Sequence, residues 1–87
     1  MNINLPKTEI LAQMAEEAAE LAQAALKLRR VIDGTNPTPV TYREAWDNLV
    51  EEFGDITICA MELDVSPDQA VMQKKLERWR KRLEGEA

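Results

Sequence analysis

Apolar residues recur every three or four positions along most of this chain, and that spacing is the feature that most constrains how it can fold. Residues at this spacing lie on one face of an α-helix, whereas a half-buried strand would alternate apolar and polar residues. No segment alternates with a period of two. We therefore expect an all-α protein in which glycine and proline separate three helices, at about residues 8–33, 41–64 and 67–83 of a single domain spanning residues 1–87.

The segment GTNPTPV, residues 34–40, separates the first two expected helices. Gly34 readily takes the left-handed conformation with which many helices end. The two prolines prevent a continuous helix and restrict φ, so we expect a semi-rigid loop. The first helix should begin near Thr8, shortly after Pro6.

Capping residues mark the starts of the other two helices. Thr41 and Glu44 fit the capping box, in which each side chain satisfies an unpaired backbone donor of the other residue. Ser66 and Gln69 fit the same pattern, with Pro67 at the first helical position. We therefore expect the second helix to start after Thr41 and the third after Ser66.

Each expected helix carries one apolar stripe. The stripes comprise Leu11, Met14, Ala18, Leu21, Ala25, Leu28 and Ile32 in the first helix, Tyr42, Trp46, Leu49, Phe53, Ile56, Ala60 and Leu63 in the second, and Met72, Leu76, Trp79 and Leu83 in the third. We expect both tryptophans, Trp46 and Trp79, to pack in the core. Val50, Ile58 and Met61 add apolar surface outside the second stripe. This surplus favours burial against another copy of the chain.

The composition excludes several classes of protein. The chain has no histidine and one cysteine, so an internal disulfide framework is excluded and a zinc site is disfavoured. A net charge of −5 argues against wrapping a nucleic-acid polymer through phosphate contacts alone. No apolar run approaches the roughly 20 residues of a membrane span, and the N-terminus does not resemble a signal peptide. We therefore expect a cytoplasmic protein with no membrane partner.

The charge is unevenly distributed. Residues 1–73 contain 5 basic and 13 acidic residues, for a net charge of −8, whereas residues 74–87 contain 6 and 3, for a net charge of +3. A basic end on an acidic body can pair with that body or gather an anion beside a metal. It can equally be a solvated helix end, because cations near a C-terminus suit the helix dipole.

Two pairs of carboxylates stand three residues apart, Glu17 with Glu20 and Glu52 with Asp55. Residues three apart are neighbours on a helix surface, and each pair lies on the flank of its apolar stripe. A short connection favours antiparallel helices, which lets the two pairs face each other. Converging carboxylates repel, and a hard cation such as Mg²⁺ or Mn²⁺, which prefers oxygen ligands, removes that conflict. The plain alternative is two solvated faces, because Glu is a good helix former.

The second pair lies in a longer motif that also contains Gly54, a residue whose position in mid-helix suggests that another backbone or a ligand comes close. Glu17-Ala-Ala-Glu20, followed by Asn48-Leu-Val-Glu-Glu-Phe-Gly-Asp-Ile56, resembles the ExxE…ExxD pattern of the MazG-like all-α nucleoside triphosphate pyrophosphohydrolases. The resemblance covers about residues 8–64. It implies a helical bundle that oligomerises, as a dimer or tetramer, into a four-helix-bundle-like architecture. It also implies house-cleaning hydrolysis of an NTP or dNTP to the monophosphate and pyrophosphate.

The resemblance also implies roles for individual residues. The implied Mg²⁺ ligands are Glu17, Glu20, Glu52 and Asp55, with Mn²⁺ as a possible substitute. Glu16 and Glu51 match acidic positions beside the motif, and one of these six residues could serve as the general base. The candidate substrate-binding residues are Lys27, Lys75, Arg78 and Arg82 for the phosphates and Gln13 for a base edge. The simpler interpretation of these basic residues is solvated surface.

Three alternatives stay open. The chain could be a non-catalytic helical oligomer that uses its acidic face to bind a partner or a structural ion. It could be an interaction module that works through the basic third helix. It could also be an enzyme similar to phosphoribosyl-ATP pyrophosphohydrolase, which has a similar EEAxE segment. That family usually has EAxD and a nearby histidine in its second motif, whereas this chain has EEFGD and no histidine, so this alternative ranks lower.

Overall fold

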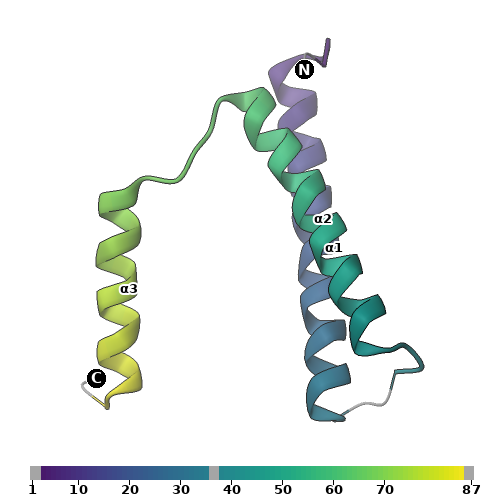
Figure 1. Cartoon of the computed structure of the whole chain (residues 1–87). Coiled ribbons are helices and arrows are strands. Elements are labelled where there is room, and N and C mark those ends of the chain that lie inside the picture. Colours follow the sequence, from purple (N-terminus) through teal and green to yellow (C-terminus); the bar gives the residue numbers. More distant parts are fainter. Residues whose placement is uncertain (1–2, 36–37, 86–87) are drawn as a thin grey trace.

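The computed structural model describes residues 3–35 and 38–85. Three helices, α1 (Lys7–Asp33), α2 (Tyr42–Leu63) and α3 (Gln69–Leu83), account for most of them, and no strand is present in these two ranges. The expected all-α fold is therefore confirmed. Helices α1 and α2 form an antiparallel hairpin, and α3 stands apart from it (Figure 1).

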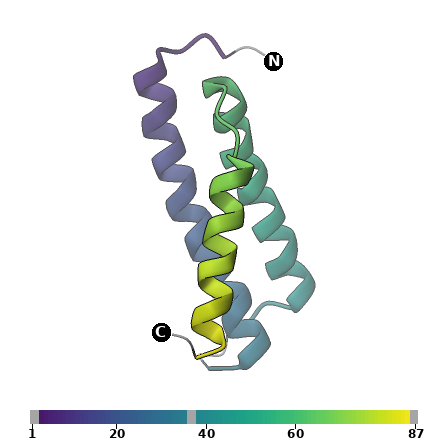
Figure 2. The same ribbon diagram turned by 90° about the vertical axis from the view of Figure 1, so that its left-hand side faces the viewer.

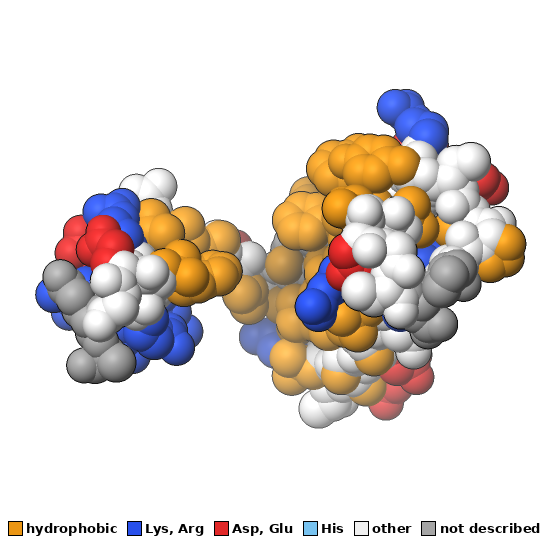
Figure 3. All heavy atoms as spheres, turned by 90° about the horizontal axis from the view of Figure 1, so that it is seen from below, with side chains coloured by type: hydrophobic (Ala, Val, Ile, Leu, Met, Phe, Trp, Pro, Cys, Tyr) orange, Lys and Arg blue, Asp and Glu red, His pale blue; other side chains and the backbone are white. Residues whose placement is uncertain are grey.

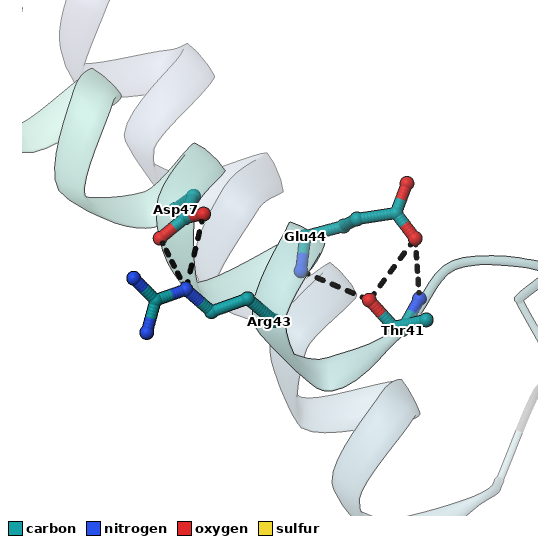
Figure 4. A network of polar contacts seen from close by, with 4 residues as sticks. All are labelled: Thr41, Arg43, Glu44 and Asp47. Atoms are coloured by element: carbon teal, nitrogen blue, oxygen red, sulfur yellow. Dashed lines mark hydrogen bonds and ion pairs between the residues drawn. The ribbon is translucent and has the colours of Figure 1, made fainter.

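Local capping determines where the first two helices meet the loop. Gly34 ends α1 with φ of 68°, and its backbone N–H donates to the carbonyl of Arg30 at 2.8 Å. The Thr41 hydroxyl accepts from the backbone N–H of Glu44 at 3.1 Å, and a Glu44 carboxylate oxygen accepts from the backbone N–H of Thr41 at 3.1 Å (Figure 4). The predicted capping box is therefore confirmed. The predicted semi-rigid loop includes residues 36 and 37, which lie outside the described residues.

The start of α3 differs from the prediction. Asp68, not Ser66, is the N-cap residue, and its side chain accepts from the backbone N–H of Val71 at 3.0 Å. Ser66 and Pro67 lie in the connector between α2 and α3. The aspartate caps at least as well as a serine and adds a negative charge that favours the helix N-terminus. The predicted second capping box, Ser66 with Gln69, is therefore wrong.

The buried residues form a narrow seam between α1 and α2. Ile10, Ala24 and Leu28 contribute from α1, and Ala45 and Cys59 from α2. Alanine at two of these five positions lets the helix backbones approach closely. The seam is thus the core of the hairpin, and it contains aliphatic residues and a cysteine rather than the expected tryptophans.

Of the seven residues of the expected α1 stripe, only Leu28 is buried in this seam. Leu11 is 52% exposed and Ile32 is 64% exposed, whereas Ile10, which the predicted stripe omits, is buried. The packed face also contains Glu17, which is half-buried. The predicted stripe is misplaced because it is chosen from apolar residues alone. The face of α1 that packs on α2 includes a carboxylate, so the apolar pattern selects the adjacent side of the helix instead.

The aromatic residues of α2 are exposed. Trp46 is 43% exposed and Phe53 61% exposed, and the ring of Tyr42 stacks on that of Trp46 with 6.3 Å between centroids. The expectation that Trp46 packs in the core is therefore wrong within one chain. We call Tyr42, Trp46, Phe53, Met61 and Val65 the apolar face of the hairpin. The apolar arc of α2 is wider than α1 alone can cover.

Helix α3 makes no packing contact with α1 or α2 within the described ranges, and none of its residues is buried there. Trp79, expected in the core, is 61% exposed. The radius of gyration is 16.4 Å, against about 12 Å for a compact chain of this length. Figure 2 shows that α3 runs alongside the hairpin rather than beyond its end.

Across residues 3–35 and 38–85, no helix combines the length and the apolar character that crossing a membrane requires.

Candidate metal centre

Three carboxylates from the two hairpin helices meet at one point. Glu17 and Glu20 come from α1 and Glu52 comes from α2, and each offers an oxygen that lies within 4.8 Å of the oxygens of the other two. The antiparallel hairpin therefore brings the pair Glu17 and Glu20 close to Glu52, one of the two residues of the second pair. This is the spacing at which one cation can contact several carboxylates.

Two oxygens of this cluster are buried and unsatisfied. Oε2 of Glu17 and Oε2 of Glu52 have no hydrogen-bond partner among the described residues. The other Glu17 oxygen, Oε1, accepts from Nε2 of Gln13 at 2.8 Å. Buried polar atoms are rarely left without a partner, and a bound ion can take the place of a hydrogen-bond donor. A cation between the helices would give both oxygens a partner.

The environment of Glu17 favours its neutral form. The hydrogen bond from Gln13 lowers the pKa of Glu17, but desolvation and the negative charges of Glu20 and Asp55 together raise it above the usual value of 4.5. Like charges disfavour ionisation of a neighbouring carboxyl. A divalent cation at this point would reverse the effect, because it stabilises every carboxylate around it.

The remaining acidic candidates lie around the cluster. Asp55 is half-buried and close enough to influence Glu17, but it is not in the set of three converging oxygens. Glu16 and Glu51 are exposed. Within the described residues, neither of these two joins the cluster. The structure thus brings together three of the four expected ligands and places the fourth beside them.

A groove of about 490 Å³ adjoins the cluster on the α1/α2 hairpin. Its lining residues are Glu20, Gln23, Ala24, Leu26, Lys27, Arg30, Asn48 and Glu52. Lys27 therefore lies in the same groove as two of the carboxylates, as the sequence suggested. A volume of this size is typical of small-molecule sites, about 300–1,000 Å³.

Sequence reasoning missed three polar residues of this groove, Gln23, Arg30 and Asn48. Asn48 lies four residues before Glu52 and Arg30 three residues after Lys27, so helical spacing could have placed both on the faces already chosen. Gln13, predicted to contact a base edge, instead holds the cluster residue Glu17.

The basic residues of α3 lie elsewhere. Lys75, Arg78 and Arg82 line a separate groove of about 340 Å³ together with Trp79. Because α3 does not contact the hairpin in the described part of the chain, these three residues are not brought to the carboxylate cluster. Within one chain, the cationic residues that accompany the cluster are Lys27 and Arg30.

The donor set decides which ions fit. The cluster offers carboxylate oxygens alone, which suits the hard cations Mg²⁺ and Mn²⁺ rather than metals that prefer nitrogen or sulfur. The two unsatisfied oxygens and the raised pKa of Glu17 are features that such an ion would relieve. The residues present therefore fit a hard divalent cation.

The chain was compared with protein-family models, with curated proteins and with solved structures, and none of the three comparisons found a match.

Proposed function

We propose that the chain is an Mg²⁺-dependent nucleoside triphosphate pyrophosphohydrolase, which converts an NTP or dNTP and water to the monophosphate and pyrophosphate. One observation carries the proposal. Three carboxylates from two helices converge, and two of their buried oxygens have no hydrogen-bond partner among the described residues. Such a cluster beside a groove of ligand size suits Mg²⁺ bound together with a phosphate-bearing substrate. Mn²⁺ is the second ion that the same ligands accept.

The groove residues support a polyphosphate substrate. Lys27 and Arg30 carry positive charge into the groove that contains Glu20 and Glu52. Lysine and arginine bind phosphate oxygens through charge-assisted hydrogen bonds. The amide of Asn48, in the same groove, can donate to a phosphate or sugar oxygen. A bound Mg²⁺ supplies charge neutralisation at the phosphates and a more acidic water.

In the proposed reaction, a water oxygen bonds to the α-phosphorus while the bond from that phosphorus to the bridging oxygen breaks. Pyrophosphate leaves with the bridging oxygen, and a carboxylate takes the proton of the water. Glu17, Glu20, Glu52 and Asp55 are the proposed ion ligands. Glu16 and Glu51 are the proposed proton acceptors, because each directly precedes a residue of the cluster in the sequence and neither joins the cluster among the described residues.

The remaining substrate contacts are also proposals. Gln13 can contact a base edge only through the amide atoms that Glu17 does not use. Lys75, Arg78 and Arg82 can reach the phosphates only if α3 comes to the groove of another copy, because α3 does not contact the hairpin in the described part of its own chain.

Product analysis tests the reaction. The purified chain is incubated with canonical and modified NTPs in the presence of Mg²⁺, Mn²⁺ or EDTA, and the products are separated by ion-exchange chromatography. We expect equimolar monophosphate and pyrophosphate with either metal and no products in EDTA. Release of single phosphates, or no turnover of any nucleotide, would overturn the proposal.

The proposal includes self-association, as a dimer or tetramer in the cytoplasm. It is supported by the exposed apolar face of the hairpin and by α3, which has no buried residue in the described chain. Small domains without disulfides or metals often gain burial by oligomerising.

A second candidate function rests on where the cluster lies. Glu17 comes from α1 and Glu52 from α2, and their carboxylates converge where the two helices pack. An ion bound by both would therefore also link the two helices. The chain could then be a non-catalytic helical oligomer with a structural ion. Binding of Mg²⁺ that raises the unfolding temperature, without turnover of any nucleotide, would favour this function over hydrolysis.

A further inference from the structure

Helix α3 is amphipathic, yet none of its residues is buried against the described part of the chain. Met72, Leu76, Trp79 and Leu83 lie along one side and are between 48% and 78% exposed. Lys75 lies beside this stripe and lines a groove with Met72, Leu76 and Trp79. A helix with one apolar side and one basic flank is the usual form of a segment that docks on another surface.

The hairpin offers a matching surface across the open space. Figure 3 shows hydrophobic atoms on the side of α3 toward the hairpin and on the side of the hairpin toward α3. A groove of about 560 Å³ is formed by the hairpin and the first residues of the connector to α3, with Met14, Phe53, Met61 and Val65 among its lining residues. Two uncovered apolar surfaces therefore face one space, and they do not touch within the described residues.

The solvent-exposed area of the chain is larger than that of a compact monomer of the same mass. The chain exposes 7228 Å², whereas a compact monomer of 9.9 kDa would expose about 5,200 Å². The difference, about 2,000 Å² per chain, is in the range that obligate homodimers bury per subunit. A second copy of this chain is large enough to cover an area of this size.

We propose that a second copy of this chain enters the space between α3 and the hairpin, and that α3 packs on the hairpin of the partner copy. This inference rests on the self-association included in the proposed function and is independent of the reaction. Two-fold symmetry makes the contact reciprocal, so the assembly closes as a dimer.

The charge distribution favours packing of α3 on the hairpin of the partner copy. Residues 1–73 carry a net charge of −8 and residues 74–87 a net charge of +3. Contacts between two hairpins alone would bring like charges together, whereas contacts between α3 and a hairpin bring opposite charges together. The basic residues of α3 therefore offset the electrostatic repulsion between two acidic hairpins.

The connector between α2 and α3 is irregular, and α3 does not contact its own hairpin within the described residues. Asp64 ends α2 with φ of 57°, and residues 65–68 have no regular secondary structure before α3 starts at Gln69. Pro67 fixes one φ angle within this segment. An anionic membrane would also suit a basic amphipathic helix, but it would leave the apolar face of the hairpin uncovered. A second copy covers both surfaces at once.

Photocrosslinking with isotope labels tests which copy α3 contacts. The full chain carries p-benzoylphenylalanine in place of Trp79, light and ¹⁵N-labelled preparations are unfolded, mixed and refolded, and crosslinked peptides are identified by mass spectrometry. We expect a dimer by sedimentation equilibrium and crosslinks from light α3 to heavy peptides within residues 3–63. Crosslinks that join only peptides of the same label would place α3 on its own hairpin and overturn the proposal.

A matched pair of substitutions tests the surface without the crosslinker. Val71 and Met72 are adjacent and similarly exposed, at 48% and 51%, but helical spacing places only Met72 on the apolar stripe. We expect Met72→Glu to raise the dimer dissociation constant about tenfold or more, and Val71→Glu to leave it within about twofold. Equal effects of the two changes would overturn the proposal, as would a monomer that binds phosphatidylglycerol vesicles through α3. A dimer with exchanged arms that hydrolyses no nucleotide would uphold this inference and overturn the proposed function.

Discussion

The α1/α2 hairpin and α3 have the same periodic apolar spacing, but only the hairpin helices cover each other. Leu28 of α1 is 7% exposed, whereas Leu76 of α3, at an equally regular position, is 48% exposed. Regular apolar spacing thus shows that a helix has an apolar side, but not which surface covers it. The buried apolar residues of the hairpin are covered by contacts within one chain, whereas we assign the contacts of the apolar side of α3 to a second copy.

The largest expected effect comes from removing a buried leucine of the hairpin. We expect Leu28→Ala to lower the free energy of unfolding by about 3 kcal/mol, because it leaves a cavity in the seam. Leu76→Ala should cost about 0.5 kcal/mol or less at concentrations where the chain is monomeric. Urea titrations at several protein concentrations measure both. A large cost of Leu76→Ala that is independent of concentration would show that α3 packs within its own chain.

The next effect concerns function. We expect Glu52→Gln to lower kcat/KM with Mg²⁺ by at least about 100-fold, because it replaces a charged ligand of the ion by a neutral amide. The same change should preserve the hairpin, since the cluster is repulsive without the ion. Glu9→Gln, on the exposed first turn of α1, is the control and should leave turnover unchanged. Circular dichroism checks the fold of both variants.

The pH dependence of stability tests the electrostatics of the cluster. The folded chain raises the pKa of Glu17, so the neutral carboxyl stabilises the hairpin; this contribution is complete below pH 4.5 and is lost as the pH rises through the raised value. Asp33 and Glu44 act in the opposite direction, because hydrogen bonds from neighbouring threonines lower their pKa values.

A comparison with Glu17→Gln isolates the contribution of this one carboxyl. In EDTA we expect the variant to gain stability relative to the wild type as the pH rises above 4.5, and Mg²⁺ to reduce that gain. Thermal unfolding of both proteins across this range provides the measurement. A difference that does not change with pH would contradict the assigned repulsion.

Smaller again is the effect of the cap of α3. We expect Asp68→Ala to destabilise α3 by about 1 kcal/mol and Ser66→Ala to have little effect, because only the Asp68 side chain accepts from the backbone of α3. Hydrogen exchange of the first turn of α3 reports this locally. A larger effect of Ser66→Ala would restore the capping box that the sequence suggested.

The sequence was sufficient where the determining interactions are local. Thr41 with Glu44 and Gly34 define their helix ends through contacts within four residues, and the structure confirms these ends. The start of α3 was misplaced because two capping residues, Ser66 and Asp68, stand two positions apart and local rules accept both.

Packing partners were harder to predict because they depend on distant parts of the chain. The apolar pattern of α1 follows Leu11 and Ile32, but the packed face includes Glu17, so tertiary contact overrides the pattern. For the site, helical spacing correctly brought Glu17 and Glu20 toward Glu52. The same spacing places Arg30 and Asn48 on these faces as well, but it does not show which polar residues of a face line a groove.

The smallest expected effect on stability comes from substitution of Gly54. It tests whether anything outside the hairpin packs against α2 at this position. A Cβ added at Gly54 would meet nothing within 4 Å in the described structure, so no backbone of the same chain requires a glycine there. We expect Gly54→Ala to stabilise the monomeric chain by about 0.5–1 kcal/mol through higher helix propensity. If a second copy or a nucleotide approaches α2 at this point, the same change should weaken dimerisation or raise KM while still stabilising the monomer. Unfolding free energy, dimer dissociation constant and KM of this one variant therefore separate the helix itself from whatever lies against it.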